Sequence, residues 1–449
     1  MRRIAFLLPL LIAIPTLAAL TLEQKRANLE SFDKVWSTVQ EKHWDPKMGG
    51  LDWQAVRAEL RPKVESAQSE AEVREIIGEM LARLHESHNA VIPGEVYHDL
   101  SNAVKAGNDA PVSAAPAAGE EDGTPGIDIR VIDQEAVVVE VEPKSPAARQ
   151  GVRPGWTIKA INDENLAPAL TRTAETYAKS TMRDMMLSRV VFSRLWGPAG
   201  NPVDIEFRDG HDKRVLLSLD RQPFRGTPSK FGYLPEEHVW IDSKRIGSDV
   251  EYIRFNLFLD PAHLVPVFQD AVRSCMTCAG IVIDLRGNPG GIGLLAAGIA
   301  GYFVAQPDEK LGTMQMRGLP LKFVVNPRPP VFTGKVAVLI DGLSASTSEI
   351  FAGGMQDLGR ARIFGTRSAG AALPSMIERL PNGDAFQFAA ASYTSQSGKV
   401  LEGAGVTPDE TRPLTRAALL AGKDPALDAA VDWIRQGARA SMNSKGITQ

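Results

Sequence analysis

The sequence predicts an α/β protein in which an α/β core follows an N-terminal helical region and a β-rich unit. Three observations lead to this prediction. Apolar residues recur at helical spacing between residues 22 and 84. Short β-branched runs bounded by turn residues follow between residues 126 and 220. From Tyr252 onward, strand-like and helix-like segments alternate, which is typical of an α/β fold.

Length and composition indicate a globular protein of two or three domains. The chain has 449 residues, of which 44% are hydrophobic and 23% are charged. The formal net charge is -4, and the sequence has no long basic run. This charge pattern argues against nucleic acid as the main partner.

The N-terminus has the pattern of a targeting segment. Arg2 and Arg3 precede an apolar run over residues 4–14, and small residues follow at Thr16 and Ala18. This pattern predicts a signal peptide over residues 1–18 and an exported protein, periplasmic or secreted. A membrane anchor is the alternative, but the apolar run is short for a span. We therefore expect no stable membrane insertion after cleavage.

An N-terminal helical domain is expected over residues 19–100. Its apolar residues repeat at helical spacing, and Ser69 with Glu72 forms a capping-box pattern. Residues 101–125 are rich in Ala, Gly, Pro, Asp and Glu, which is typical of a linker. The apolar positions that define the two helical runs are Phe32, Val35, Trp36 and Val39, then Val73, Ile76, Ile77, Met80, Leu81 and Leu84.

The β-rich unit is expected over residues 126–220. Its predicted strands cover residues 126–131, 136–141, 157–162, 203–207 and 214–219, and one long helix is expected over 170–196. The last two strands are joined through Asp209 and Gly210, a strong turn signal.

The α/β core is expected over residues 221–437, with a polar, flexible tail over 438–449. Strands are predicted at residues 280–285, 336–340 and 362–365, with a helix at 292–303. Cys275 and Cys278 have the spacing C-x-x-C. No thioredoxin-like context surrounds them, so a structural role is expected, whether the two thiols are free or bridged.

A strand-to-helix turn in the core carries a run of small hydroxyl residues, Ser344-Ala-Ser-Thr-Ser348. Helix N-terminal amides point at charge that develops beside such a turn, so the position suits a nucleophile. Ser and Thr are also preferred helix N-caps, so simple capping is the alternative. Far away in sequence, Ser87-His88 supplies an imidazole, the usual base for a serine hydroxyl.

Residues 126–220 resemble a PDZ domain of the permuted bacterial type. The resemblance lies in Ser145-Pro-Ala-Ala148, Gly151-Val-Arg-Pro-Gly155 and Ile161-Asn162. It implies peptide binding by strand addition, with a carboxylate-binding loop formed by Gly126, Ile127, Asp128 and Ile129. Because Asp128 would repel a terminal carboxylate, we expect weak binding of a free C-terminus.

Residues 22–92 and 222–437 resemble the tricorn-like and C-terminal-processing serine peptidases. The matching motifs are Asp284-Leu-Arg-Gly-Asn-Pro-Gly-Gly291, Ser344-Ala-Ser-Thr-Ser-Glu349 and Gly403-Ala-Gly-Val-Thr-Pro-Asp409. The resemblance implies a crotonase-like α/β core, with Ser346 as the nucleophile.

The same resemblance distinguishes two types of site. The Ser-Lys type has a lysine where this chain has Ala371, and its supporting Gln is Ser375 here. The Ser-His type uses a histidine base, a second serine and a glutamate, which the resemblance assigns to His88, Ser87 and Glu402. His85 is the competing imidazole, and a solvated loop carboxylate is the alternative for Glu402.

Backbone amides are expected to form the oxyanion hole. Thr347 follows the nucleophile, and Gly290 or Gly291 offers the second N–H. The resemblance then implies an exported serine endopeptidase that forms an acyl-enzyme on peptides or unfolded proteins, without a metal or organic cofactor. The alternative is a catalytically inactive binding protein on the same fold, as in retinoid-carrier modules. The oligomeric state is left open.

Overall fold

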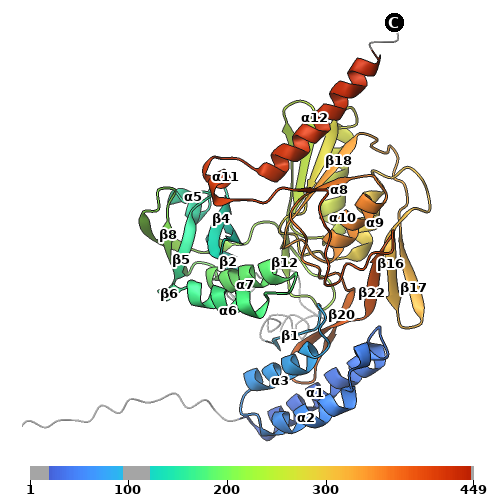
Figure 1. The fold of residues 1–449 in the computed structure, drawn as a ribbon. Coiled ribbons are helices and arrows are strands. Elements are labelled where there is room, and N and C mark those ends of the chain that lie inside the picture. Colours follow the sequence, from blue (N-terminus) through green and yellow to red (C-terminus); the bar gives the residue numbers. More distant parts are fainter. Residues whose placement is uncertain (1–19, 95–121, 446–449) are drawn as a thin grey trace, which may run out of the picture.

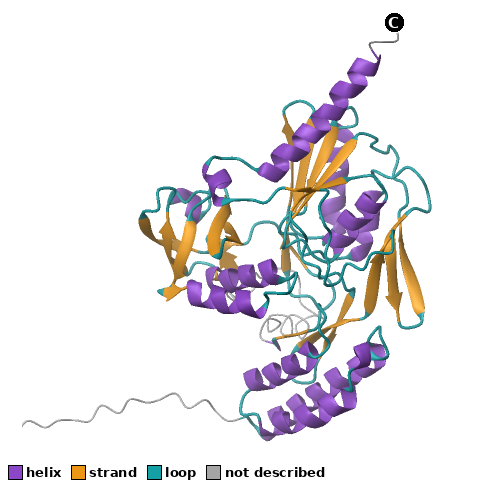
Figure 2. Ribbon diagram, in the orientation of Figure 1, coloured by secondary structure: helices purple, strands orange, loops and turns teal. Residues whose placement is uncertain are grey.

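The computed structural model of the protein describes residues 20–94 and 122–445, with side chains to residue 436. The predicted signal peptide and residues 101–121 of the predicted linker lie outside the described residues. In Figure 1 the N-terminal helices, the β-rich unit and the α/β core occupy three separate regions around a central set of loops. Figure 2 shows the first region as helical and the other two as mixtures of strands and helices.

The N-terminal region is a helical unit whose core is shared with a distant part of the chain. Its helices are α1 (Leu22–Lys42), the short 3-10 turn η1 (Met48–Gly50), α2 (Trp53–Ser66) and α3 (Glu70–Ala82). Thr21, Asp52 and Ser69 cap the three long helices by accepting backbone N–H groups. A hairpin of β20 (Ser375–Arg379) and β21 (Ala385–Ala389) packs Phe386 and Phe388 into this core. The strand β1 (Ala90–Ile92) pairs antiparallel with β21.

The predicted N-terminal domain is therefore not packed on itself alone. Phe386 and Phe388, about 300 positions later in the chain, complete its apolar core. Local sequence patterns cannot predict such a long-range contact. This joint core fixes the end of α3 against the α/β core.

The β-rich unit is a six-stranded sheet covered by helices. Its strand order is β3-β4-β5-β8-β9, with β6 added beside β5. The strands are β3 (Ile127–Ile132), β4 (Glu135–Val141), β5 (Thr157–Ile161), β6 (Glu164–Asn165), β8 (Pro202–Arg208) and β9 (Arg214–Asp220). The helices are α5 (Pro146–Arg149), α6 (Ala167–Thr176) and α7 (Arg183–Leu195), and a small sheet joins β2 (Asp122–Thr124), β7 (Gly197–Pro198) and β10 (Gln222–Pro223).

Two predictions for this region are wrong. The single helix expected over residues 170–196 is broken between α6 and α7. The Ser180 hydroxyl accepts the Met182 N–H, so a side chain takes an amide that a continuous helix would use. The end of the predicted linker is strand β2, because Gly123 and Thr124 pair with residues that follow the unit.

The α/β core is built on a six-stranded sheet of order β13-β14-β15-β18-β19-β23. The pair β13–β14 is antiparallel and the remaining pairs are parallel. Helix α12 packs on one face, and α8, α9 and α10 pack on the other. The bounds are β13 (Ile241–Ile246), β14 (Val250–Phe255), β15 (Gly280–Asp284), β18 (Lys335–Ile340), β19 (Arg362–Gly365), β23 (Glu410–Thr411), α8 (Pro261–Ser274), α9 (Gly293–Ala300), α10 (Thr347–Asp357) and α12 (Pro425–Lys445).

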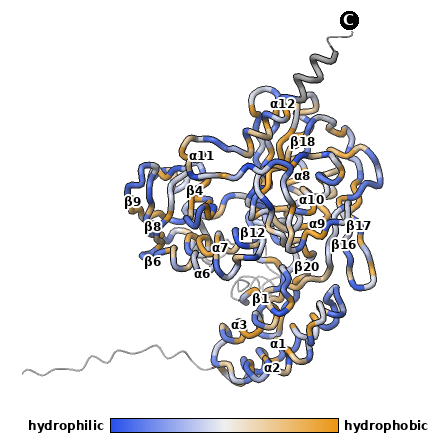
Figure 3. The backbone as a smooth tube through the Cα atoms, in the orientation of Figure 1, coloured by the Kyte–Doolittle hydropathy of each residue, from blue (hydrophilic) through white to orange (hydrophobic). Residues whose placement is uncertain are grey.

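Because the inner strands are covered on both faces, their sequences are continuous apolar runs. Val336–Ile340 of β18 is entirely buried, and the hydropathy colouring of Figure 3 follows this inner strand. The carboxyl ends of β15 and β18 are adjacent in the sheet, so the loops that follow them meet at one edge.

The remaining elements lie at the periphery of the core. Helix α12 continues through Lys445, so residues 438–445 of the expected tail are helical. Cys275 and Cys278 form a disulfide. No helix in the described ranges is long and apolar enough to cross a membrane. The peripheral elements are β11 (Thr227–Ser229), β12 (Glu237–Val239), β16 (Lys310–Met316), β17 (Leu319–Val324), β22 (Ala391–Ser395) and α11 (Arg416–Leu420).

Candidate active site

Ser346 lies at the turn between β18 and α10 in a backbone conformation that capping does not explain. A helix N-cap normally has extended dihedrals, whereas Ser346 has φ 53° and ψ -116°. Positive φ is strained for a residue with a side chain and persists only where the surroundings impose it. Ser346 is thus the N-cap of α10, in a capping box with Glu349, and its backbone turns more sharply than that of an ordinary cap.

The neighbouring hydroxyl groups are buried and already bonded. Ser344 Oγ donates to Leu285 O at 2.7 Å, and Ser348 Oγ donates to Asn288 O at 2.9 Å. Thr347 Oγ1 donates to Gly291 O at 2.8 Å. Among the four hydroxyl residues of this run, only Ser346 is partly exposed.

Glu349 fixes the conformation of this turn from inside the protein. Its buried carboxylate accepts the N–H groups of Ser346, Gly370 and Ala371 and the hydroxyl of Ser368, over distances of 2.6–3.0 Å. Burial raises the pKa of Glu349 to about 7, against the opposing effect of these hydrogen bonds. Glu349 thus ties the serine turn to residues 368–371.

Two backbone amides beside the serine turn, those of Thr347 and Gly291, have no hydrogen-bond partner in the described structure. Thr347 is the first residue of α10, where an N–H has no partner within the helix. A Cβ atom at Gly290 would lie 2.8 Å from Thr347 N, so only glycine allows this approach. The Gly290 amide itself donates to Asn288 Oδ1 at 2.9 Å. Of the two glycines expected from sequence, Gly291 is therefore the one with an amide left for a substrate.

Ser87, His88 and Glu402 form one connected chain. Ser87 Oγ lies 2.7 Å from His88 Nδ1 and donates to Glu402 Oε2 at 2.9 Å. An ionised carboxylate only accepts hydrogen bonds, and a hydroxyl has a single proton to give. Ser87 therefore accepts from Nδ1–H, and the lone pair of His88 lies on Nε2. This is the tautomer that a general base requires.

Burial sets the charge state of this imidazole. It lowers the pKa of His88 to about 4, so the ring is neutral at physiological pH. Burial also raises the pKa of Glu402, against the hydrogen bonds from Ser87 and Ala372. His85, the competing imidazole, is exposed to solvent. The alternative of a solvated loop carboxylate for Glu402 is wrong, because this side chain accepts three hydrogen bonds.

The serine turn and the imidazole chain are linked through adjacent backbone groups. Ser346 N–H donates to Ala371 O at 2.8 Å, and Ala372 N–H donates to Glu402 Oε2 at 2.9 Å. Within the described residues, no hydrogen bond joins Ser346 to His88 directly. The segment 371–372 thus holds the two halves of the site in a fixed relation.

Residues of the β-rich unit pack around Ala371, the position at which the Ser-Lys type has its lysine. Ala371 is buried with Ala345 and Ala369, and Met182 and Met185 pack against them. A Cβ atom at Gly370 would lie 2.4 Å from Thr181 Oγ1. The start of α7 therefore occupies space beside the serine turn.

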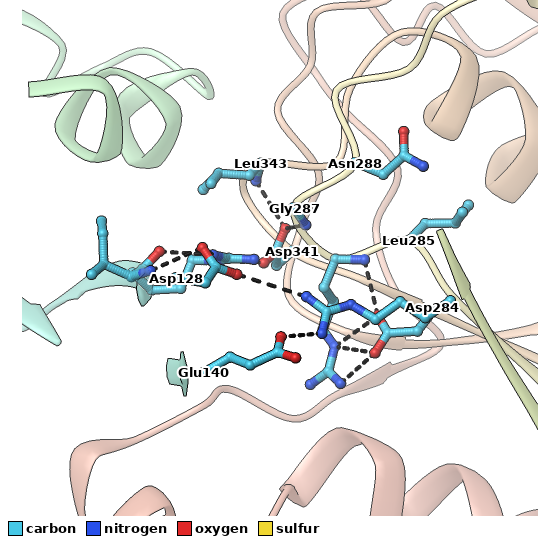
Figure 4. Close-up of polar contacts among 12 residues, drawn as sticks. Asp128, Glu140, Asp284, Leu285, Gly287, Asn288, Asp341 and Leu343 are labelled. Carbon is cyan, nitrogen blue, oxygen red and sulfur yellow. Dashed lines mark hydrogen bonds and ion pairs between the residues drawn. The ribbon is translucent and has the colours of Figure 1, made fainter. Parts of the chain in front are cut away.

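Charged residues also bind the β-rich unit to the loops of the core. Arg130 Nε from β3 donates to Asp341 Oδ2 at 2.6 Å. Asp341 Oδ1 accepts the N–H groups of Gly287 and Leu343, which lie in the two loops that meet at the sheet edge. Figure 4 shows Asp341 between these amides, with Asp128 facing it from the β-rich unit. The arginine thus braces the loops that carry Gly291 and Ser346.

A second pair of carboxylates strengthens this contact. Asp284 is buried, yet its pKa is held at about 2 because Arg286 and Arg254 outweigh the effect of burial. Arg254 also forms an ion pair with Glu140 of β4. Figure 4 shows Glu140 on the opposite side of this cluster from Asp284.

The predicted peptide-binding loop is partly occupied by internal bonds. Gly126 N–H donates to Thr124 Oγ1 and Ile129 N–H donates to Asp128 Oδ1. The side chains of Ile127 and Ile129 are buried in the core of the unit. Asp128 is paired with Arg130 at 2.9 Å, so its charge is neutralised by an arginine instead of facing open space. The expected reason for weak carboxylate binding, repulsion by a free Asp128, is wrong.

A cavity of about 360 Å³ lies between β3, α7 and the core. Ser188 lines it, and the Ser188 hydroxyl is buried without a hydrogen-bond partner in the described structure. In the described ranges, no group of three or more His, Cys, Asp or Glu side chains could hold a metal ion.

Sequence reasoning did not assign a role to Glu349, Asn288, Asp341 or Arg130. For Glu349 a signal was present, because Ser346-Thr-Ser-Glu349 fits the capping-box pattern. The roles of the other three depend on contacts between distant segments, for which the sequence has no local signal.

Two parts of the chain match the models of known protein families. Residues 249–412 match the family model for peptidase family S41, and residues 25–82 match that of the tricorn protease C1 domain. A carboxyl-terminal-processing protease of Synechocystis sp. is 26% identical over 96% of this chain and 92% of its own length. One from Picosynechococcus sp. is 26% identical over 90% and 88%. A carboxy-terminal-processing protease of Bartonella bacilliformis is 27% identical over 64% of this chain and only 61% of its own length.

Two solved structures share the fold. The photosystem II D1 C-terminal processing protease has a TM-score of 0.57 at 20% identity, covering 91% of this chain and 99% of the other. The tricorn protease has a TM-score of 0.52 at 16% identity, covering 92% of this chain and 37% of the other. The protein is thus a mixed α/β protein that shares its fold with these two proteases. Its sequence relatives support the carboxyl-terminal-processing protease family, and it is an enzyme of the serine peptidase type.

Proposed function

We propose that the protein is an exported serine endopeptidase of the Ser-His type. Ser346 is the nucleophile, His88 is the general base, and Ser87 with Glu402 orients the imidazole. The observation that carries this proposal is the chain from Glu402 through Ser87 to His88 Nδ1, because it leaves Nε2 free to accept a proton.

Proton transfer begins the reaction. His88 Nε2 takes the Ser346 hydroxyl proton while Oγ forms a bond to the substrate carbonyl carbon. Catalytic hydrogen bonds are often long in a free enzyme and shorten when substrate binds. The Ser346–His88 contact is therefore expected to form in the substrate complex, guided by the rigid 371–372 segment.

The amides of Thr347 and Gly291 then stabilise the oxyanion. Removing one such donor typically costs on the order of a hundred- to a thousand-fold in rate. The N-terminus of α10 adds its partial positive charge at the same place. The fixed turn matters here because donors that are already aligned need no reorganisation during the reaction.

Breakdown of the tetrahedral intermediate completes acylation. The C–N bond breaks, and His88 gives its proton to the leaving amine. Water then attacks the acyl-enzyme, and His88 accepts the water proton and returns it to Ser346. The scheme uses only side chains and amides of this chain, and its substrates are peptides or unfolded proteins.

We assign the supporting parts as follows. Residues 126–220 are a PDZ-like domain, and residues 221–437 are a crotonase-like catalytic core. The helical domain over 19–100 carries His88. Residues 1–18 are the signal peptide of an exported, periplasmic or secreted protein. The open edge of β3 and the cavity beside α7 support a peptide-binding role for the PDZ-like domain.

A catalytically inactive binding protein on the same fold is the second candidate. The unpartnered Ser188 hydroxyl in the cavity favours a bound ligand of some kind. Cleavage of a fluorogenic peptide library by wild type, Ser346→Ala and His88→Ala decides between the two. The peptidase proposal predicts turnover by wild type alone, whereas binding without turnover in all three proteins would favour the second candidate.

A further inference from the structure

The turn that bears Ser87 and His88 is strained in two places. His85 has φ 56° and His88 has φ 61°, both in the left-handed region that residues with side chains seldom adopt. Such strain persists only where neighbouring groups hold the backbone in place. The group in the middle of this turn is Glu86.

The Glu86 carboxylate is held by three donors. His43 Nε2 lies 2.8 Å from Oε2, Trp44 Nε1 donates to Oε1 at 3.0 Å, and Asn89 Nδ2 donates to Oε2 at 3.4 Å. His43 and Trp44 directly follow α1, and only 2% of the His43 side chain is exposed. Residues that follow α1 therefore bind the turn that follows α3.

We infer that His43 and Trp44 are positioning residues, which act through Glu86 to hold the Ser87–His88 turn in its reactive geometry. This inference rests on the proposed function. Hydrogen bonds to a charged group are stronger and more directional than those between neutral groups. Three of them on one carboxylate fix the residue next to Ser87.

The contact between His43 and Glu86 also has an electrostatic effect on Glu402. Burial is the main cause of the raised pKa of Glu402, and the negative charge of Glu86 adds to it. His43 supplies the opposing positive charge when it is protonated. Burial works against that protonation, but the bonds from His43 to Glu86 and to Asp45 O outweigh it, and the pKa of His43 is raised. The Asp45 N–H lies 3.2 Å from His43 Nδ1. In the neutral ring, Nδ1 can accept from this N–H while Nε2–H donates to Glu86. The Glu86 bond thus survives in both charge states.

His43→Ala and Trp44→Phe test the inference. Misplacement of a catalytic group by about an ångström costs up to a hundred-fold in rate. We expect His43→Ala to lower kcat about ten- to a hundred-fold with KM unchanged, and its pH–rate profile to move to higher pH as Glu402 becomes easier to protonate. Trp44→Phe, which loses only one N–H donor, should lower kcat less. His43→Gln should recover part of the loss, because its amide can still donate to Glu86.

The controls separate positioning from folding. His211→Ala alters an exposed histidine in the β8–β9 turn and should leave kcat unchanged. All rates are divided by the concentration of competent sites, titrated with a fluorophosphonate probe. The inference would be overturned if both His43→Ala and Trp44→Phe had the wild-type kcat per competent site and the wild-type pH profile. That outcome would leave the proposed function intact. If the wild-type protein does not react with the probe at Ser346, both fail together.

Discussion

Glu402 holds Ser87 at two points. Oε1 accepts the Ser87 backbone N–H at 2.8 Å, and Oε2 accepts its hydroxyl proton at 2.9 Å. The double contact fixes the direction in which the hydroxyl proton points. That direction decides which nitrogen of His88 is free to act as a base.

Glu402→Gln is therefore expected to lower kcat strongly. The side-chain NH₂ group of glutamine would replace one carboxylate oxygen that accepts from Ser87. If this NH₂ group faces the Ser87 hydroxyl, the hydroxyl can donate to His88 Nδ1 instead of accepting from it. Loss of the correct tautomer in a serine peptidase triad costs up to about 10⁴-fold in kcat. Steady-state kinetics should show this loss with KM little changed. A near-normal kcat would mean that Glu402 does not orient the base.

The pH dependence of kcat/KM should reflect the buried imidazole. The sequence alone suggests an ionisation near ~6.5, but burial lowers the pKa of His88 to about 4. We expect the rate to rise as pH increases through about 4, and to be on its plateau at neutral pH. The neutral ring also favours the folded state. That contribution is present above the unfolded pKa of 6.5 and is lost as pH falls through about 4. An acidic limb centred near ~6.5 would mean that the imidazole is more hydrated than its burial implies, whereas a rate independent of pH between about 4 and about 7.5 in which His88→Ala matches wild type would contradict the assignment of the base.

Glu349→Ala should destabilise the protein and the site together. It leaves the N–H groups of Gly370 and Ala371 and the Ser368 hydroxyl without their acceptor, at about 1–3 kcal/mol for each group. Ser346 N–H keeps Ala371 O as an acceptor. Because the folded-state pKa of Glu349 is raised from 4.5 to about 7, its titration favours folding fully below 4.5 and loses this effect as pH rises through 7. Urea unfolding of wild type and Glu349→Gln between pH 4 and 8 measures this. Equal pH dependence of the two unfolding free energies would refute it.

Ala371→Lys should not create a Ser-Lys site. Met182 and Met185 pack against Ala371, so a lysine would overpack the interface and bury a charge. Ser375 Oγ accepts a hydrogen bond from Gln387 Nε2 and lies on β20, rather than supporting a lysine. We expect a lower melting temperature and no rescue when Ala371→Lys is added to His88→Ala. Recovery of turnover in the double variant would show that the space is available.

The β-rich unit is expected to bind a peptide acid no better than its amide. The Gly126 and Ile129 amides are already bonded to Thr124 and Asp128, which leaves few donors for a carboxylate. Isothermal titration with the two peptides measures this, and a clear preference for the acid would contradict it. Asp128→Gly removes a partner of Arg130 and should loosen the contact with the core, rather than strengthen acid binding.

The strands that the sequence predicted are present, and the serine turn lies where it was expected, because their signals are local. Strands β13, β16, β17, β20, β21 and β22 were not predicted. The inner strands of the core are apolar runs of the expected lengths, and Asp209-Gly210 lies between β8 and β9 as predicted. The break between α6 and α7 was missed because residues 177–182, which separate the two helices, contain no Gly or Pro to signal a turn. The shared core of α1–α3 with Phe386 and Phe388 was missed because it joins distant segments.

The candidate site divides in the same way. The turn around Ser346 and the Ser87-His88 pair could be picked out from motifs. The choice of Gly291 over Gly290 required the Asn288 contact, and the low pKa of His88 required knowledge of its burial. The bracing of Asp341 by Arg130 joins two domains and could not be read from either one alone.

The central claim is that Ser346 is a nucleophile activated by His88. Its most direct test is mass spectrometry of the protein after reaction with a fluorophosphonate probe, with peptide mapping of the modified residue. We expect one adduct, located on Ser346. It should be absent in Ser346→Ala, slowed on the order of a thousand-fold in His88→Ala, and retained in Ser344→Ala and Ser348→Ala. An adduct on another residue, or labelling of Ser346→Ala at the wild-type rate, would contradict the account.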